Sequence, residues 1–292
     1  MTAHKDRNLE GKVCIVTGAT SGIGKETARA LAHQGGTVIL VGRNPEKTLA
    51  TVEKFRHEAD TPNVEYLLAD LSSQDEIRRL VEEFKSRHNR LDVLVNNVGA
   101  FFLRRQESVD GIEMTFALNH LGYFLLTDLL LDTIMASVPA RIINVSSRSH
   151  RRAVMKFDDL QGHKGYSGIK AYGQSKLANV LFTYELARRL EGTGVTVNAL
   201  HPGFVATNMG SNNGWIVRAF RPLMNLRALS VEEGAETAIY LATSPDVEGI
   251  TGKYFIQCTA VPSSAYSYDV TVAKQLWAVS EEMTGQTRPP AV

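Results

Sequence analysis

The first half of the chain alternates short runs of consecutive apolar residues with longer stretches in which apolar residues recur every three or four positions. The short runs indicate strands buried on both faces, and the longer stretches predict helices. This alternation is typical of a parallel sheet covered by helices on both sides. The predicted strands are 12–17, 37–41, 64–68 and 91–95, and the predicted helices are 25–33, 45–59 and 74–88.

The second half continues the alternation without a linker, an internal repeat or a low-complexity tract. Its predicted strands are 141–145, 195–200 and 253–256, and its predicted helices are 112–136, 171–191 and 231–243. We therefore predict a single α/β domain over residues 1–292, a doubly wound parallel sheet of about seven strands, which is the Rossmann fold. The irregular segments 148–170 and 203–230 are long for loops of a compact domain, and such loops are usually functional.

Composition and charge narrow the class of protein. The 292 residues carry 32 Lys and Arg against 31 Asp and Glu, so no global basic field favours nucleic acid as a partner. Cys14 and Cys258 lie in apolar runs that we interpret as strands, and we expect buried, reduced thiols. The polar start MTAHKDRNLEGK has no signal-peptide core, and no apolar run approaches the ~20 residues that span a bilayer. We expect a cytoplasmic protein with no transmembrane segment.

A glycine-rich segment, TGATSGIG at residues 17–24, joins the first predicted strand to the first predicted helix. Glycines at such a turn let the backbone approach a pyrophosphate, whose charge the helix N-terminus stabilises. A turn with a purely structural role is the alternative, but the strand before it and the helix after it favour a dinucleotide site. The predicted cofactor contacts are Gly18, Ser21, Gly22, Ile23 and Gly24.

The end of the second strand bears on which dinucleotide binds. An NAD site places an acid about 20 residues beyond the glycines, where it binds the ribose 2′-hydroxyl. Gly42 offers no carboxylate there, whereas the guanidinium of Arg43 suits a 2′-phosphate. A solvated arginine is the alternative interpretation of Arg43. The sequence favours NADP(H) over NAD(H).

Two more strand ends carry candidate cofactor residues. Asp70 can accept a hydrogen bond from an adenine amino group, with the Leu71 backbone beside it, or it can serve as a turn or capping carboxylate. Asn97 and Gly99 belong to the segment NNVG after the fourth strand, where glycine allows close approach of the cofactor. A simple Asn/Gly turn is the alternative there.

Four polar residues form the candidate catalytic set. Tyr172 and Lys176 are spaced i, i+4 and share one face of a helix, where an ammonium would lower the pKa of the phenol. Ser147 ends a strand and can bond a substrate carbonyl, although a capping serine is equally compatible. Asn119 lies inside a predicted helix, where asparagine is unfavourable and therefore needs an explanation.

Taken together, the motifs resemble the short-chain dehydrogenase/reductase family. TGATSGIG, NNVG, Asn119, Ser147, Tyr172-x-x-x-Lys176 and Pro202-Gly203 occur in the family's order. Val98 replaces the alanine of the usual NNAG, a departure that we expect to be tolerated. The phrases LNHLGYFLLTDLLL and YGQSKLANVLFTYELARRLEGTGVTVNALHPG resemble the retinol dehydrogenase branch.

The resemblance implies a role for each matched residue. Tyr172 would be the general acid in reduction and the base in oxidation, and Lys176 would lower its pKa and bind the nicotinamide ribose. Ser147 would orient and polarise the carbonyl. Asn119 would hold a water that links Lys176 to solvent. The resemblance also implies cofactor contacts from Pro202, Val205 and Thr207 and a substrate lid at about residues 203–230.

The predicted lid is apolar and basic, with Arg218, Arg221 and Arg227 and no acid. Other arginines fall in loops expected on the same rim: Arg104, Arg105, Arg148, Arg151 and Arg152. An ordinary lid with solvated arginines explains this composition. The alternative is a pocket for an apolar carbonyl compound that is anionic or is delivered from a membrane surface.

The function that these residues favour is an NADP(H)-dependent oxidoreductase that interconverts a lipophilic aldehyde or ketone and its alcohol. A redox-sensing NADP(H)-binding protein, a light-dependent protochlorophyllide-type reductase and a nucleotide-sugar epimerase or dehydratase are the rival interpretations. By family analogy the long helices would form a homo-oligomer interface.

Overall fold

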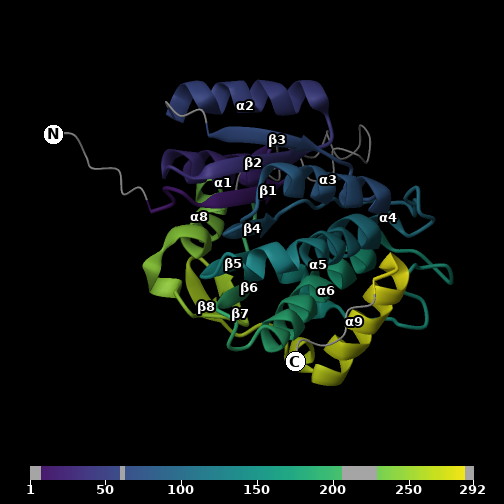
Figure 1. Ribbon diagram of the computed structural model, residues 1–292. Coiled ribbons are helices and arrows are strands. Elements are labelled where there is room, and N and C mark those ends of the chain that lie inside the picture. The colour runs from purple at the N-terminus through teal and green to yellow at the C-terminus, as the bar shows by residue number, and fades with distance from the viewer. Residues whose placement is uncertain (1–7, 60–62, 206–228, 287–292) are drawn as a thin grey trace.

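The computed structural model describes residues 8–59, 63–205 and 229–286, and Figure 1 shows them as one sheet with helices on both faces. The strand order is β3-β2-β1-β4-β5-β6-β7-β8. The strands are β1 Val13–Thr17, β2 Thr37–Gly42, β3 Val64–Leu68, β4 Val93–Asn96, β5 Ala140–Val145, β6 Val195–His201, β7 Lys253–Ile256 and β8 Thr259–Val261. The first seven strands run parallel, which confirms the doubly wound Rossmann-type sheet.

The sheet has one strand more than we predicted. β8 pairs antiparallel with β7, with Phe255 opposite Ala260. The turn between them places Gln257 and Cys258 at φ values of 48° and 58°, in the left-handed region that non-glycine residues rarely adopt. Cys258 is therefore a partly exposed turn residue, and our prediction of a buried strand thiol was wrong for it. Cys14 is fully buried in β1, as predicted.

The helices fall into two layers that bury the two faces of the sheet. In β1, Val13 and Ile15 pack with the layer containing α3 and α5, whereas Cys14 and Val16 pack with the layer containing α1 and α8. This alternation along one strand explains why the strands are apolar on both faces. The main helices are α1 Gly22–His33, α2 Pro45–Ala59, α3 Gln74–Arg87, α5 Gly122–Met135, α6 Gly168–Arg189, α8 Val231–Thr243 and α9 Val270–Thr284.

The predicted helix 112–136 is interrupted near its start. It consists of α4 Met114–Phe116, a π-helical turn Ala117–Leu121 and then α5. By length and composition the stretch Met114–Met135 could cross a membrane, but 83% of its most apolar window is buried inside the fold. It is packed as a core helix of the Rossmann domain.

A buried network of side-chain hydrogen bonds links the helices α5 and α6 to the central strands β4 and β5. Asn96 at the end of β4 donates to Thr127 on α5 at 2.9 Å and to the Asn144 side chain on β5 at 2.9 Å. Asn144 in turn donates to Thr183 on α6 at 2.9 Å. The network links α5, β4, β5 and α6 through side chains that are all almost fully buried.

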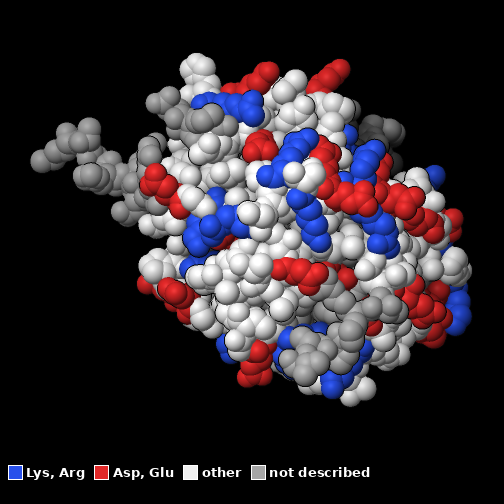
Figure 2. All heavy atoms as spheres, in the orientation of Figure 1, with Lys and Arg blue, Asp and Glu red and all other residues white. Residues whose placement is uncertain are grey.

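On the face seen in Figure 2, Lys and Arg side chains are interspersed with Asp and Glu, in keeping with the net charge of +1.

Candidate active site

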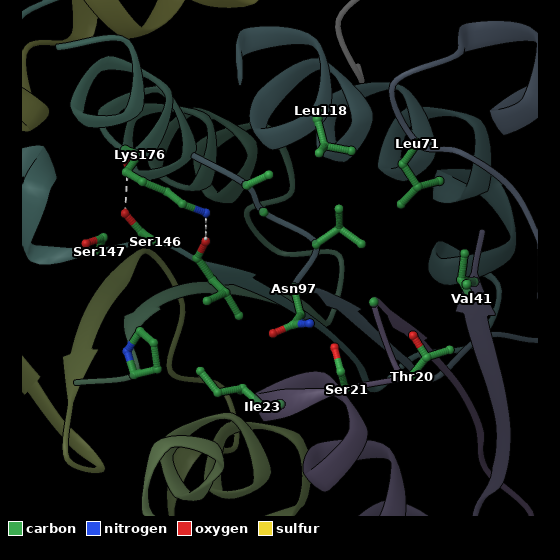
Figure 3. A pocket seen from close by; sticks show the side chains of 18 of the residues that line it. Thr20, Ser21, Ile23, Val41, Leu71, Asn97, Leu118, Ser146, Ser147 and Lys176 are labelled. Atoms are coloured by element: carbon green, nitrogen blue, oxygen red, sulfur yellow. Dashed lines mark hydrogen bonds between the residues drawn. The ribbon is translucent and has the colours of Figure 1, made fainter. Parts of the chain in front are cut away.

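An elongated cavity of about 310 Å³ follows the carboxyl ends of the strands. In Figure 3, Thr20 and Val41 lie toward one end of it, and Ser147 and Lys176 lie toward the other. The crevice at this edge of an open α/β sheet, where the strand order reverses between β1 and β4, is where ligands of such folds bind. The glycine-rich turn, the strand-end residues and the Tyr-Ser-Lys group, which lie far apart in sequence, thus face one cavity.

The glycine-rich turn requires glycine at three positions. Gly18 and Gly22 have φ values of 65° and 56°, in the region that side chains rarely adopt. A Cβ on Gly24 would lie 2.3 Å from Asn97 Nδ2 and 2.6 Å from the Gly18 carbonyl oxygen. Gly24 thus packs against Asn97 and the Gly18 backbone, and its predicted contact with the cofactor stays a prediction. Gly18, Ser21, Gly22 and Ile23 do line the cavity.

Asn97 joins this turn to the neighbouring strand end. Its backbone N–H donates to Thr17 Oγ1 at 2.8 Å, and its side chain donates to the Thr17 carbonyl at 2.8 Å. Asn97 and Gly99 both line the cavity. Their segment is therefore more than a simple turn, because it braces the carboxyl ends of β1 and β4 against each other.

Arg43 and Asp70 face each other at the end of the cavity away from Ser147 and Lys176. The guanidinium Nη1 lies 3.7 Å from Asp70 Oδ2, and the two side chains are 66% and 34% exposed. Asp70 also accepts hydrogen bonds from Ser72, from its backbone at 3.0 Å and its hydroxyl at 2.7 Å. Arg43, Asp70 and Leu71 all line the cavity, and their contacts with an adenosine stay a prediction.

The surroundings of Gly42 leave no room for a side chain. A Cβ on Gly42 would lie 2.4 Å from Thr48 Oγ1 and 2.8 Å from Thr20 Cγ2. A carboxylate therefore does not fit there without displacing its neighbours. The charged groups that line the cavity near this position are the guanidinium of Arg43 and the carboxylate of Asp70.

Lys176 is the most deeply buried charged group of the cavity, at 2% exposure. Its Nζ donates to the Val145 carbonyl at 2.9 Å and lies 5.9 Å from the centre of the Tyr172 ring. Burial lowers the pKa of Lys176 to about 7. At neutral pH the amine is thus poised between its charged and neutral forms, as a group that passes a proton must be.

Tyr172 lies in the cavity wall beside Ser147, but its pKa differs from our prediction. Burial raises the pKa of Tyr172 to about 12, and a hydrogen bond with Ser147 acts in the opposite direction without overcoming it. The predicted lowering by Lys176 is not found, because desolvation dominates and the amine is bonded to Val145. Tyr172 is therefore a neutral phenol at neutral pH, the form that donates a proton.

Ser147 both caps a helix and lines the cavity, and its predicted bond to a substrate carbonyl stays a prediction. It caps the short helix η2, Arg148–Arg152, by accepting from the Ser149 backbone N–H at 3.2 Å. Its hydroxyl also faces the cavity and donates to Ser149 Oγ at 3.3 Å. The hydroxyl thus lies between Tyr172 on one side and Ser149 on the other.

Asn119 is explained by the π-helical turn in which it lies. Its Oδ1 accepts from the Ala100 N–H at 2.8 Å, and its Nδ2 donates to the Ala100 carbonyl at 2.9 Å and to Ser175 Oγ at 3.1 Å. π-Turns frequently mark functional sites, because they turn a residue out of helical register. Asn119 is fully buried behind the cavity wall, where it fixes the segment after β4.

Gly99 is the point at which these groups come closest. A Cβ there would lie 3.1 Å from Lys176 Nζ and 3.6 Å from Asn119 Oδ1. The side chains of Asn119 and Lys176 therefore both lie close to Gly99, and the proton relay through Asn119 stays a prediction.

The segment after β6 is described only at its ends. Pro202 and Gly203 line the cavity, and Val205 forms a bridge with Leu229 without lining it. Thr207 and most of the predicted lid lie outside the described residues.

His201 is a cavity residue that sequence reasoning missed. It is 8% exposed, its Nδ1 has no hydrogen-bond partner among the described residues, and its pKa is lowered to about 4 by burial and by Arg148. Its position directly before Pro202-Gly203 was the available signal. His201 is a neutral imidazole in the wall near Ser147.

The cavity fits a nicotinamide dinucleotide. The positive-φ glycines and the start of α1 form a cradle for a pyrophosphate. The residues that would hold it are Gly18, Ser21, Gly22, Ile23, Arg43, Asp70, Leu71, Asn97, Gly99, Tyr172, Lys176 and Pro202.

A fold and cavity of this kind are those of the dinucleotide-dependent oxidoreductases. Sequence comparison is more specific, because residues 12–214 match the short chain dehydrogenase family, and the chain belongs to this family. Its similarity falls in the retinol dehydrogenase-like branch. Mouse retinol dehydrogenase 14 is 42% identical, with 95% of this chain and 87% of that protein covered. Human polyprenol dehydrogenase is 43% identical, with 94% and 85% covered.

Solved structures agree with this assignment. An uncharacterized protein from Mycobacterium paratuberculosis aligns with a TM-score of 0.77 at 32% identity, covering 96% of each chain. The NADP complex of RhlG from Pseudomonas aeruginosa aligns with a TM-score of 0.69 at 28% identity, covering 90% of this chain and 99% of that one. The protein is accordingly an oxidoreductase that acts on the CH–OH/C=O pair.

Proposed function

We propose that the protein is an NADP(H)-dependent reductase of lipophilic aldehydes or ketones. The observation that carries this proposal is the meeting of Tyr172, Ser147 and Lys176 at one end of a cavity whose other end presents Arg43. The names of the relatives support a lipophilic substrate, because retinol and polyprenol are both long apolar alcohols. The NADP complex of RhlG and the exposed Arg43 support NADP(H) over NAD(H).

The mechanism assigns one task to each residue. The nicotinamide supplies the hydride when it is bound. Ser147 donates a hydrogen bond to the carbonyl oxygen and polarises it. Tyr172 is a protonated phenol at neutral pH and donates its phenolic proton to the same oxygen. Lys176, whose pKa is about 7, then supplies the proton that restores the phenol of Tyr172. The Nζ of Lys176 lies beside the backbone of Gly99.

The raised pKa of Tyr172 limits the oxidative direction at neutral pH. Oxidation needs the phenolate as a base, and a phenol with a pKa of about 12 supplies little phenolate at neutral pH. We therefore propose that the alcohol-oxidising rate rises with pH from 7 to 10, whereas the carbonyl-reducing rate does not.

A turnover screen tests the proposal. Aldehydes, ketones and alcohols of increasing chain length are assayed with NADPH, NADP, NADH and NAD. Tyr172→Phe should lower turnover by at least ~100-fold while NADPH still binds, because it removes the proton donor and keeps the ring. Tyr240→Phe, on α8 and away from the cavity, is the matched control and should keep full turnover.

Two results would contradict the proposal. Near-native turnover of Tyr172→Phe would remove the tyrosine from the mechanism. Tight NADPH binding with no turnover of any compound would favour the redox-sensing alternative.

A further inference from the structure

A second cavity, of about 740 Å³, lies beside the active site and shares no lining residue with it. Apart from Glu113, every residue that lines it belongs to the stretch 148–174, which contains η2 and the start of α6. Ser147 and Tyr172 face the active site, while their neighbours Arg148 and Gly173 line this second cavity. Neighbouring residues of the same two segments therefore line the two cavities.

Hydrogen bonds hold the wall of the second cavity in shape. Gln174 on α6 accepts from the Lys156 backbone at 3.0 Å and donates to the Leu160 carbonyl at 3.0 Å. Tyr166 donates to Glu113 Oε1 at 3.0 Å and closes the other side. Binding cavities are usually formed in advance and measure about 300–1,000 Å³, so size and bracing both fit a small-molecule site.

The charged residues around the cavity are strongly unbalanced. Five cations line it: Arg148, Arg151, Arg152, Lys156 and Lys170. None of the five forms an ion pair with a described residue, although Arg151 donates to the Pro262 carbonyl.

Two acidic residues also line the cavity, and both already accept hydrogen bonds from backbone N–H groups. Glu113 is buried and accepts from the Thr115 and Phe116 backbone N–H groups, and Asp159 accepts from the His163 and Lys164 backbone N–H groups. An anion would thus meet several uncommitted cations.

Part of the remaining lining is apolar and open to solvent. Val154 is 53% exposed and Ile169 is 75% exposed, and Leu160 and Ala153 line the cavity behind them. A free inorganic anion would use the cations and leave this apolar surface in water. A molecule with both a charged head and an alkyl chain would use both parts of the lining.

We propose that this cavity is a binding site for a single-chain anionic amphiphile, one alkyl or isoprenoid tail with a carboxylate or phosphate head. The head lies among the arginines and lysines, and the tail lies along Val154, Leu160 and Ile169. The site is independent of the proposed function, because it needs neither the nicotinamide cofactor nor turnover.

Calorimetric titration of the full chain tests the proposal with octyl phosphate and octanoate as probes. We expect saturable binding of both, and at least tenfold weaker binding of 1-octanol and of inorganic phosphate. Arg152→Glu should weaken octyl phosphate at least tenfold, and Ile169→Ser severalfold. Lys85→Glu on α3, which makes the same charge change away from the cavity, should keep the wild-type affinity.

A titration with octyl phosphate in the presence of saturating NADPH tests whether the probe binds in this cavity or in the active site. We expect NADPH to leave the affinity for octyl phosphate unchanged, since the cavities share no lining residue. Competition by NADPH would place the amphiphile in the active site and overturn the proposal.

Three other results would also overturn it. These are no binding of either probe, equal losses in Arg152→Glu and Lys85→Glu, and binding only to phosphatidylserine vesicles, which would make this face a membrane contact. Lys170→Glu replaces Arg152→Glu if circular dichroism shows that the latter does not fold.

Discussion

Replacing Arg43 by alanine separates the two nicotinamide cofactors. A hydrogen bond to a charged group contributes about 1.5–3 kcal/mol, or roughly ten- to a hundredfold in affinity. The Arg43 side chain is 66% exposed, and its guanidinium lies 3.7 Å from Asp70, so solvent and a neighbouring carboxylate both reduce the gain. We therefore expect Arg43→Ala to weaken NADPH by about tenfold, at the lower end of that range.

The change should be confined to the phosphorylated cofactor. NADH lacks the 2′-phosphate, so Arg43→Ala should leave its affinity nearly unchanged. Arg43→Lys keeps the charge but loses the planar fork, and it should fall between wild type and Arg43→Ala. Calorimetric titration of all three proteins with both cofactors, repeated at high salt, gives the comparison. Equal losses for NADPH and NADH would show that Arg43 supports the adenosine pocket rather than the phosphate, and the argument for NADP(H) would fail.

Three further changes follow from the packing. Gly24→Ala should lower both thermal stability and NADPH affinity, measured by circular dichroism and titration, because its Cβ would lie 2.3 Å from Asn97 Nδ2; a wild-type melting curve would contradict this. Asn119→Ala should cost about 1–3 kcal/mol of unfolding free energy for each Ala100 backbone group left unpaired, and urea unfolding that matches wild type would refute it. His120 is fully buried, and burial lowers its pKa to about 3 in the folded protein, whereas an imidazole in the unfolded chain has a pKa of about 6.5. Below about pH 6.5 the unfolded chain therefore binds one proton more than the folded protein, and the free energy of unfolding falls. The contribution of His120 to the unfolding free energy should fall by about 2 kcal/mol at pH 5, and His120→Gln should reduce this dependence on pH.

The sequence predicted the elements that have a strong pattern. All seven parallel strands were recognisable, because burial on both faces leaves uninterrupted apolar runs. β8 was missed because Thr259–Val261 is short, and the left-handed backbone at Cys258 has no signature in a non-glycine residue. α9 was also missed, although its buried residues Ala273, Leu276 and Trp277 recur at helical spacing.

The sequence indicated which residues make up the candidate site, but not the pKa values of its titratable groups. The glycine-rich turn and the Tyr172–Lys176 spacing identified which residues meet. The pKa of Tyr172 could not be obtained from that spacing, because it depends on how much solvent the surrounding fold excludes. The second cavity was equally hidden, since the segment 148–174 reads only as an irregular stretch followed by a helix.

The Asn96–Asn144–Thr183 network has a consequence for the position of the catalytic helix. A leucine side chain on a helix tolerates a small shift of the helix along its axis, because it can pack against any apolar neighbour. Thr183 has no such latitude, because its hydroxyl accepts from the single amide of Asn144 at 2.9 Å, and a shift of one turn, about 5.4 Å, would strand that amide in the core. Tyr172 and Lys176 are carried on the same helix, three and two turns away. The asparagine pair at the centre of the sheet thus serves as an axial stop that sets the depth to which the proton donor projects over the crevice.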